Sequence, residues 1–553
     1  MVRSAREVVV GCPVGPVAAN RIGARSWGPF RSAGEAVLAG ASILALAHMI
    51  ATMVTGGYTL SLGLARLSGK SVLTPAIVGS ISAAGWIWVR SLRAGPSPAG
   101  RAAAVFFLCV AAFILNRDVA ISGDVVPATY LPLAVVAHGA LDLNGFPFLY
   151  ENGLVHSMTN YGGRVFSSYP LGAPLAALPF YVPAGVGRGV PGGFVLELGK
   201  AAAAALAAAS AAVFYLLLSR MTSARVSGLA TGAYALGTST LSSSAQMLWQ
   251  HAPAQLFIVL GMWVLFRADA DPRRAWLAGI PFGLAVACRP TNVLVFAVFG
   301  VYAVWRHGPG ALAYMLGIVP PILLTLGYNF AYYGVWNATI GGYNRGMMEG
   351  FVTPFFEGLA GLTVSPGRGL LVYSPVLAFS LAGFVLAWRR RAPLAIAAGL
   401  AAGAVLGLHA KWDGWWGGVC FGPRLLSDAL PLLSLLLVPA LEWIERGGGP
   451  RAILRIWFGV LLGISVWIHA MGACIPNRWD GAHFSHGNLA EDARELWKVK
   501  DGPLVTYASD LFRPVPESAA FAGTLVLAAV AFAVLLRGTR SAAPATDVVR
   551  IGG

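Results

Sequence analysis

The chain has 553 residues, of which 57% are hydrophobic and 11% are charged, and its formal net charge is +16. Soluble domains carry roughly 25% charged residues, so this composition excludes an ordinary soluble globular protein. A chain this apolar needs lipid as its solvent.

Apolar stretches that approach the ~20 residues needed to cross a bilayer recur along the chain. They predict an all-α polytopic membrane protein with about 14 transmembrane helices, placed in the cell inner (plasma) membrane. The pair 275–287 and 289–305 is the weakest, because its first member is short and Arg289-Pro290 interrupts it. The predicted spans are 36–54, 73–90, 102–117, 197–218, 226–241, 250–267, 275–287, 289–305, 311–332, 368–388, 392–409, 426–441, 456–473 and 518–537.

The loop charges predict the orientation, because cytoplasmic loops collect Lys and Arg. With the N-terminus inside and the spans alternating, the inside segments hold 23 of the 39 basic residues and 7 of the 23 acidic residues. The rest of the chain then holds 16 of each sign, so the whole net charge of +16 falls on one side. Both termini are therefore expected in the cytoplasm, and no nucleic-acid partner is needed to explain the basic charge.

The same topology divides the chain into four regions. Residues 1–35 carry five Arg without a continuous apolar core, which predicts a cytoplasmic basic tail rather than a cleavable signal peptide. Residues 36–440 form the transmembrane region expected to hold the catalytic site, including the outer loop 118–196. Residues 441–537 add further helices with a small outer segment at 474–517, and 538–553 form a cytoplasmic tail.

The first long outer loop contains an apolar stretch that is not expected to cross the membrane. Prolines break it at four positions, which is unfavourable for a straight spanning helix. We expect one or two helices lying at the outer interface. These prolines are Pro170, Pro174, Pro179 and Pro183.

Two patterns have competing interpretations. Asp269 and Asp271, on a cytoplasmic loop, are compatible with a metal–nucleotide site, but a solvated turn beside basic residues is favoured. Cys420 and Cys474 both fall outside and are compatible with a disulfide, although two unpaired cysteines are favoured.

Asp124 is the candidate catalytic base. It follows the third predicted span closely and is flanked by Gly123 and Pro127. Partial burial at the lipid boundary would raise the pKa of the carboxyl group and make it a better base. The alternative is a capping or solvated aspartate, and Asp118 is the next candidate.

Four arginines at predicted outer ends of spans are candidate ligands for a phosphate. Each lies in a sequence rich in Gly or Pro, and guanidinium groups match phosphate oxygens. Interfacial anchoring is the competing interpretation. We expect two of them, Arg289 and Arg368, to point into one cavity and bind the same phosphate, whereas the other two could instead pair with Glu349, Asp413 or Asp428. The four are Arg289, Arg345, Arg368 and Arg424.

Aromatic side chains occur at the same predicted level. Trp415 and Trp416, with glycines after them, favour a platform for a sugar ring or an isoprenoid chain over a plain interfacial belt. His251, at the outer end of the span 250–267, completes the candidate substrate-binding set together with Tyr130 and Tyr169.

Asp124, then Tyr130 six residues later, and a loop ending in Ser-x-Tyr-Pro-Leu-Gly around Tyr169 form an ordered pattern. This pattern resembles the first lumenal loop of membrane glycosyltransferases of the GT-C type, with the protein O-mannosyltransferases and the lipid A aminoarabinose transferase as the closest comparisons. The stretches SPGRGLLVYSP and WDGWWGGVCFGPRLLSDALP resemble bacterial members, so the likeness covers about residues 100–440. Two features depart from those families: Asp124 lacks an acidic neighbour, and Ser168 and Tyr169 stand where a lysine is usual.

The resemblance implies direct, inverting displacement at the anomeric carbon of a polyprenyl-phosphate-linked sugar donor. Asp124 would take the proton of the acceptor, and the arginines would hold the departing phosphate. Such reactions need no nucleotide cofactor and usually no metal, so neither a cofactor nor a metal site is expected. The expected partners are the lipid-linked donor, a lipid, glycan or protein acceptor, and membrane lipids.

Two other functions use similar residues. A transporter or flippase of a lipid-linked saccharide would also present arginines and aromatic rings at the outer face, but internal repeats and charges near the bilayer midplane would be expected. The sequence displays neither pattern. A ligase that moves whole glycans is the third interpretation.

Overall fold

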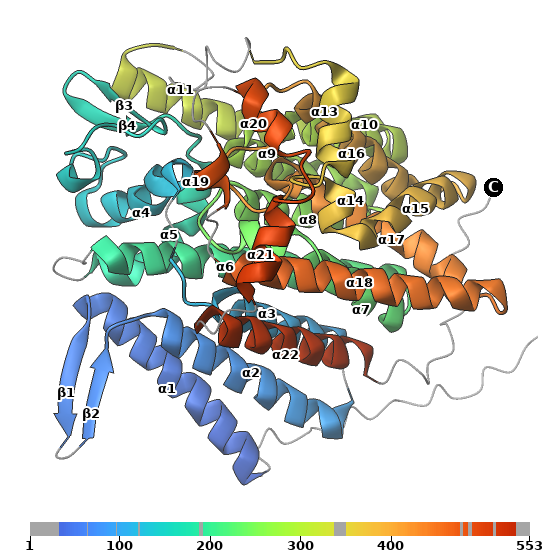
Figure 1. The fold of residues 1–553 in the computed structure, drawn as a ribbon, viewed down its shortest axis with the longest axis horizontal. Helices are drawn as coiled ribbons and strands as arrows, with labels where there is room; N and C mark the ends of the chain where they lie inside the picture. The colour runs from blue at the N-terminus through green and yellow to red at the C-terminus, as the bar shows by residue number, and fades with distance from the viewer. Residues whose placement is uncertain are drawn as a thin grey trace, which may run out of the picture.

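The computed structural model describes residues 32–62, 65–95, 97–119, 122–186, 192–336, 350–475, 479–484, 489–511 and 516–537. Long helices dominate this part of the chain (Figure 1). Each of the fourteen predicted spans overlaps one of them. They are α1 (Ala33–Thr55), α2 (Leu73–Ala94), α3 (Pro98–Ile114), α6 (Gly192–Met221), α7 (Ala224–Leu236), α8 (His251–Ala268), α9 (Gly279–Cys288), α10 (Val293–His307), α11 (Val319–Tyr333), α15 (Ala378–Arg389), α16 (Pro393–Ala410), α17 (Leu430–Glu445), α18 (Pro450–Cys474) and α22 (Pro516–Leu536).

Eight helices of the described residues are long and apolar enough to cross a membrane, so the chain has the build of a multi-pass membrane protein. The total of about fourteen spans stays a prediction, because several of the remaining helices are shorter than a bilayer requires. α1 shows the lipid-facing character most clearly, since Val37, Ile43 and Leu44 are all more than 60% exposed.

Shorter helices connect the long ones. Pro begins five of the 3₁₀ segments in the described part of the chain, where its fixed φ and missing N–H are tolerated. The short segments are η1 (Gly123–Val125), η2 (Pro147–Leu149), the π-helical η3 (Thr240–Ser244), η4 (Pro272–Ala278), η5 (Pro290–Asn292), η6 (Pro309–Ile318), α13 (Phe355–Val364), α14 (Leu370–Tyr373), η8 (Pro375–Leu377) and η9 (Arg424–Ala429).

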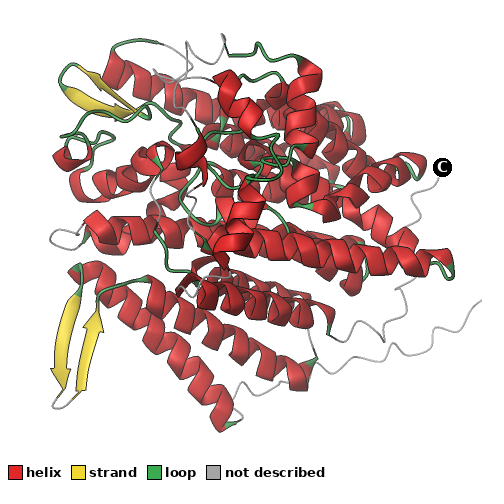
Figure 2. Ribbon diagram, viewed as in Figure 1, coloured by secondary structure: helices red, strands yellow, loops and turns green. Residues whose placement is uncertain are grey.

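Two hairpins correct the all-α prediction (Figure 2). β1 (Tyr58–Leu62) pairs antiparallel with β2 (Ala65–Gly69), and β3 (Met158–Tyr161) pairs with β4 (Arg164–Ser167). The second hairpin turns at Gly162 and Gly163, which both have positive φ, at 58° and 78°. Glycine adopts this conformation without strain, and a Gly-Gly pair between short strands is a hairpin signal that hydropathy alone does not detect.

The first long loop contains two helices, α4 (Val126–His138) and α5 (Gly172–Gly185). α5 has 14 residues, which at 1.5 Å per residue is about 21 Å and too short for the ~30 Å hydrocarbon core. The expected helices are therefore present in this loop, and their position at the interface remains a prediction. The segment 474–517 contains α19 (Trp479–His483), α20 (Leu489–Glu495) and α21 (Pro503–Leu511).

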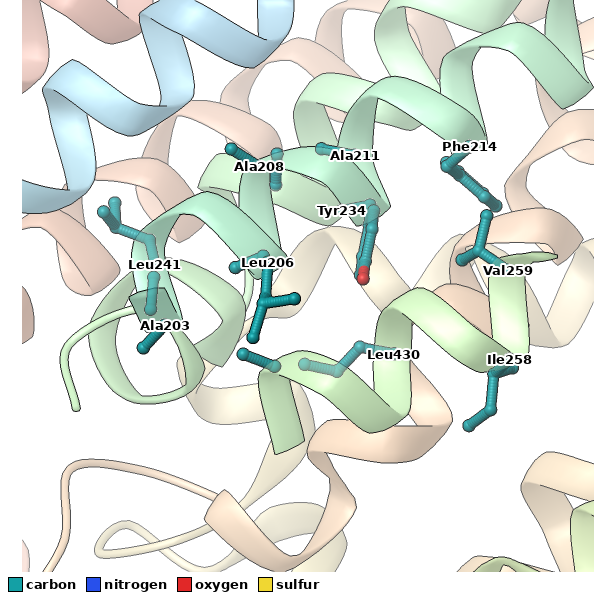
Figure 3. Packing of buried hydrophobic residues seen from close by; sticks show 14 of the residues in the cluster. Ala203, Leu206, Ala208, Ala211, Phe214, Tyr234, Leu241, Ile258, Val259 and Leu430 are labelled. Carbon is teal, nitrogen blue, oxygen red and sulfur yellow. The ribbon is translucent and has the colours of Figure 1, made fainter. Parts of the chain in front are cut away.

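α6 is the centre of the core. Its alanine-rich face lets the neighbouring helices approach closely, as small residues do between membrane helices. Figure 3 shows Ala203, Leu206 and Phe214 of this helix in one buried cluster with Tyr234 of α7 and Ile258 of α8, and the ring centroids of Phe214 and Tyr234 are 5.1 Å apart. All five are buried. This rigid centre supports the start of α8 and the loop after α3, which are the segments that meet at the candidate site.

Candidate active site

A cavity of about 1080 Å³ lies where the loop after α3 meets the segment before α17. Its walls come from the turn before β3, the residues after η3, the start of α8 and the α9–η5 junction as well. Both signs of charge are present. The ionisable residues of the lining are Asp118, Asp124, His156, His251, Arg289, His409, Asp413 and Arg424.

Asp124 is the centre of one group of polar side chains, which we call the Asp124 group. Arg424 donates from Nη1 to Oδ2 at 2.6 Å, and the His156 Nε2 lies 2.6 Å from Oδ1. The Tyr169 hydroxyl donates to the same Oδ1 at 2.8 Å. The side chain of Asp124 is 18% exposed, so this group borders the cavity rather than the dry interior.

Local structure explains why these side chains meet. Arg424 begins η9 and lies over the ring of Trp249, at 4.1 Å, which holds the guanidinium plane in the cavity. His156 precedes β3, and its ring packs on Gly123, where a Cβ would lie only 2.9 Å from the imidazole. The absence of a side chain at Gly123 therefore permits the contact between His156 and Asp124.

The charges of the Asp124 group set its protonation. Burial would raise the pKa of Asp124, but the Arg424 guanidinium and the hydrogen bonds from His156, Arg424 and Tyr169 outweigh burial and lower this pKa below its ordinary value. This corrects the expectation that burial makes Asp124 a stronger base. The hydrogen bond to Asp124 raises the pKa of His156, against burial and the charge of Arg424.

Asp428 is the centre of a second, more deeply buried group, the Asp428 group. Its Oδ1 lies 3.0 Å from the His251 Nδ1, and its Oδ2 accepts from Arg289 at 3.1 Å and from Asn292 at 3.1 Å. Arg289 also lies 2.8 Å from the His409 Nε2. Asp428 is completely buried, and both of its carboxylate oxygens are engaged.

The position of Arg289 follows from Pro290. The residue before a proline is pushed out of the helical region, and Arg289 has φ −149° and ψ 114° between α9 and η5. The interruption that weakens the predicted span pair is therefore the feature that turns this arginine toward Asp428.

Of the other predicted site residues, Arg368 does not line the cavity. It is completely buried, and its Nη2 donates to Asp480 of α19 at 2.7 Å and to the Gly418 carbonyl. A cation in the dry interior needs such a partner. The expectation that Arg289 and Arg368 bind one phosphate is thus corrected: the first borders the cavity and the second fastens α19 to the segment before α17.

Of the aromatic candidates, some border the cavity and others are buried away from it. Trp416 borders the cavity, whereas Trp415 is buried beside it with ring centroids 5.7 Å apart. Tyr130 is also buried and packs against Phe146. Arg345 lies outside the described residues.

Sequence reasoning gave no role in the site to three residues. Asp428 was considered only as a possible partner of Arg345 or Arg424, and His156, six residues before the Gly162-Gly163 turn, was not considered. The third is Lys200 of α6, which is buried and donates to Asn116 at 2.6 Å, to Gln246 at 3.1 Å and to the Asp118 carbonyl. It fixes the loop that leads to Asp124.

The remaining patterns have simple environments. Asp269 pairs with Arg306 and Asp271 pairs with Arg274, as in a solvated turn. Cys420 and Cys474 are buried free thiols. In the part of the chain that the structure describes, no three His, Cys, Asp or Glu residues are grouped so that they could hold a metal ion.

Comparison with known proteins gives one fold-level likeness. No family model matches the chain, and no curated protein matches its sequence. The crystal structure of ArnT from Cupriavidus metallidurans bound to undecaprenyl phosphate is similar over 82% of this chain and 77% of that chain, with 14% identity and a TM-score of 0.45. At this level the similarity does not assign the chain to a family.

Proposed function

We propose that this protein is a membrane glycosyltransferase that moves a sugar from a polyprenyl-phosphate donor to an acceptor at the outer face of the membrane, with inversion at the anomeric carbon. The observation that carries the proposal is the Asp124–Arg424 ion pair on the wall of the 1080 Å³ cavity. It brings together the carboxylate and the guanidinium that such a transfer needs, from residues 300 positions apart.

Arg424 is the proposed contact for the donor phosphate. Its guanidinium borders the cavity and lies over the ring of Trp249, so a move from the carboxylate to a phosphate in the cavity would keep it within the site. Arg289 is a weaker candidate, because its side chain is 6% exposed against 12% for Arg424. Its terminal nitrogens also bind three partners, Asp428, the Leu425 carbonyl and His409, whereas among the described residues those of Arg424 bind only Asp124 and the Gly417 carbonyl. Protonated His156 would add a second positive charge beside Arg424.

Asp124 is the proposed partner of the acceptor hydroxyl. While Arg424 is bound to it, the lowered pKa makes Asp124 a weak base. A donor phosphate that draws Arg424 away removes the largest of the contributions that lower this pKa, and burial then raises it. The acceptor oxygen then bonds to the anomeric carbon, the carbon–oxygen bond to phosphate breaks with its electron pair on the phosphate oxygen, and the hydroxyl proton passes to Asp124.

Aromatic rings supply the apolar part of the site. Trp412 and Trp416 border the cavity together with Phe351 and Trp249. Such faces suit the C–H surface of a sugar ring or the first isoprene units of the donor, while the polar groups above fix its phosphate. The acceptor is proposed at the class level only, as a lipid, a glycan or a protein.

The test is a transfer assay with the purified chain in lipid nanodiscs, labelled polyprenyl-phosphate sugars and a panel of the three acceptor classes. We expect Asp124→Asn to lower turnover by about 10²–10⁴-fold, the usual effect of losing a general base. Donor binding should be retained or tightened, because Arg424 loses its competing carboxylate. The anomeric configuration of the product, read by NMR, tests inversion.

Asp142→Asn is the matched control. Asp142 lies on the same loop and pairs with Arg164 at 2.5 Å, but it does not line the cavity. The variant should keep turnover in proportion to folded protein. Absence of transfer by the wild-type chain with every donor and acceptor would refute the function, whereas near-normal turnover of Asp124→Asn would refute only the role of Asp124 and point next to Asp118.

A further inference from the structure

The Asp428 group contains a histidine that borders the cavity and has one ring nitrogen engaged. His251 opens α8 and borders the cavity, while its Nδ1 faces Asp428 at 3.0 Å. An ionised carboxylate only accepts hydrogen bonds, so the hydrogen of a neutral imidazole lies on Nδ1 and the lone pair on Nε2. Among the described residues, Nε2 has no hydrogen-bond partner.

The surroundings of His251 hold this arrangement in place. Arg289 and Asn292 bind the other oxygen of Asp428, so the carboxylate cannot rotate away without losing three hydrogen bonds. Arg289 alone balances the charge of Asp428. His251 is therefore not needed for charge balance, and its Nδ1 satisfies Oδ1 of Asp428 while leaving Nε2 for another partner.

We propose that His251, oriented by Asp428, is a second proton acceptor of this cavity and takes the proton of the acceptor hydroxyl while the Asp124–Arg424 ion pair is intact. The proposal rests on the proposed sugar transfer. The acceptor oxygen bonds to the anomeric carbon, the bond to phosphate breaks with its electron pair on the phosphate oxygen, and the proton goes to Nε2. A carboxylate behind the imidazole stabilises the imidazolium that forms.

The charged surroundings of His251 come from several elements. Asp428 of η9 is its direct partner, and Arg289, Arg424 and His409 are the other charged or titratable groups that interact with it. No ion pair with an arginine has to break before His251 can accept a proton, whereas Asp124 must first lose Arg424.

The first experiment reads the availability of Nε2 and needs no sugar transfer. The chain in nanodiscs is treated with diethyl pyrocarbonate, which modifies unprotonated, accessible imidazole nitrogens, and the sites are mapped by mass spectrometry. We expect His251 to be modified through the cavity and to be protected by polyprenyl phosphate. His409 and His469 are internal controls, because both ring nitrogens of each are engaged.

The second experiment separates a chemical role from a structural one. In His251→Asn the amide nitrogen takes the place of Nδ1 and can still donate to Asp428, but no group replaces Nε2. We expect turnover to fall, by less than in Asp124→Asn because Asp124 still accepts the proton once Arg424 has moved to the phosphate, with donor affinity within about threefold of wild type. His251→Gln, which replaces Nε2 but not Nδ1, is the companion variant if the first is poorly folded.

The outcomes are distinct. Near-normal turnover of a folded His251→Asn overturns the proposal, and so does a His251 as unreactive as His409, because a nitrogen that the reagent cannot reach is closed to an acceptor hydroxyl. If the wild-type chain transfers no sugar, the proposed function fails, while the modification pattern still shows whether Nε2 faces the cavity.

Discussion

The Asp124 group and the Asp428 group each combine an aspartate, an arginine and a histidine. They differ in how far their side chains are exposed to solvent and in which side chain is fixed by its neighbours. In the Asp124 group the histidine side chain is 64% exposed and the carboxylate is bound by three donors at the cavity wall. In the Asp428 group the carboxylate is fully buried and the histidine is 5% exposed. The same residue types thus give a phosphate-responsive ion pair in one place and a fixed, oriented imidazole in the other.

The largest expected contrast is in stability. Asp428→Asn offers one acceptor where Asp428 offers two, so either His251 or Arg289 faces an amide N–H in the dry interior. Removing one partner of a buried ion pair typically costs roughly 3–5 kcal/mol. We expect a clear fall in the thermal unfolding temperature of Asp428→Asn, measured in nanodiscs.

Asp124→Asn is the matched variant for this measurement. Its neighbours can be rehydrated from the cavity, so its unfolding temperature should change much less. Equal losses in the two variants would mean that the groups do not differ in burial as the structure indicates.

A smaller effect is expected from pH, and only in the Asp124 group. His156 has a raised pKa because of its hydrogen bond to Asp124, so its charge is present below the ordinary histidine value of about 6.5 and is lost as pH rises through the raised value. Binding of polyprenyl phosphate should therefore weaken with rising pH in this window, by up to about tenfold if one unit charge contributes about 1.4 kcal/mol.

His156→Gln is the control for the pH dependence, since it cannot carry the charge. Its donor affinity should be lower and flat across the same window. A wild-type affinity that is equally flat would show that His156 does not act on the phosphate.

The smallest effect is expected from Gly123→Ala. The added Cβ would lie 2.9 Å from His156 and would push the imidazole away without changing any charged group. We expect donor affinity to fall only a few-fold and the pH dependence to flatten toward that of His156→Gln. Gly193→Ala is the control, because nothing lies within 4 Å of the added Cβ. Gly139 has the same open space, but its φ of 64° would strain an alanine.

Much of the fold follows from hydropathy, because a span needs only a run of apolar residues and each predicted run overlaps a helix. The hairpins were missed because their strands are short and their signal lies in glycines rather than in hydropathy. The pairing of charges is harder still. From the sequence, Arg345 and Arg424 were expected to bind phosphate or, alternatively, to pair with Glu349, Asp413 or Asp428. The structure pairs Arg424 with Asp124 instead.

Arg368 is a second case in which the sequence did not reveal the partner of a charged residue. Its Gly- and Pro-rich context is the one that favoured a phosphate site, yet Asp480, more than a hundred residues later, neutralises it. Sequence context reports that a cation is unusual for its depth, but only tertiary contacts decide whether a carboxylate of the chain or a ligand is its partner.

Arg424 and Asp428 belong to one short element, η9, so this element fixes how the Asp124 group and the Asp428 group are placed relative to each other. η9 is a 3₁₀ helix, with about three residues per turn and a rise of about 2 Å, so side chains four positions apart are separated by about 8 Å and turned by about 120°. η9 therefore holds Arg424 toward the Asp124 group and Asp428 toward the other group. Inserting a single residue between Arg424 and Asp428 would turn one of them by about a further 120° and break its contacts, whereas a substitution that keeps the 3₁₀ helix would not.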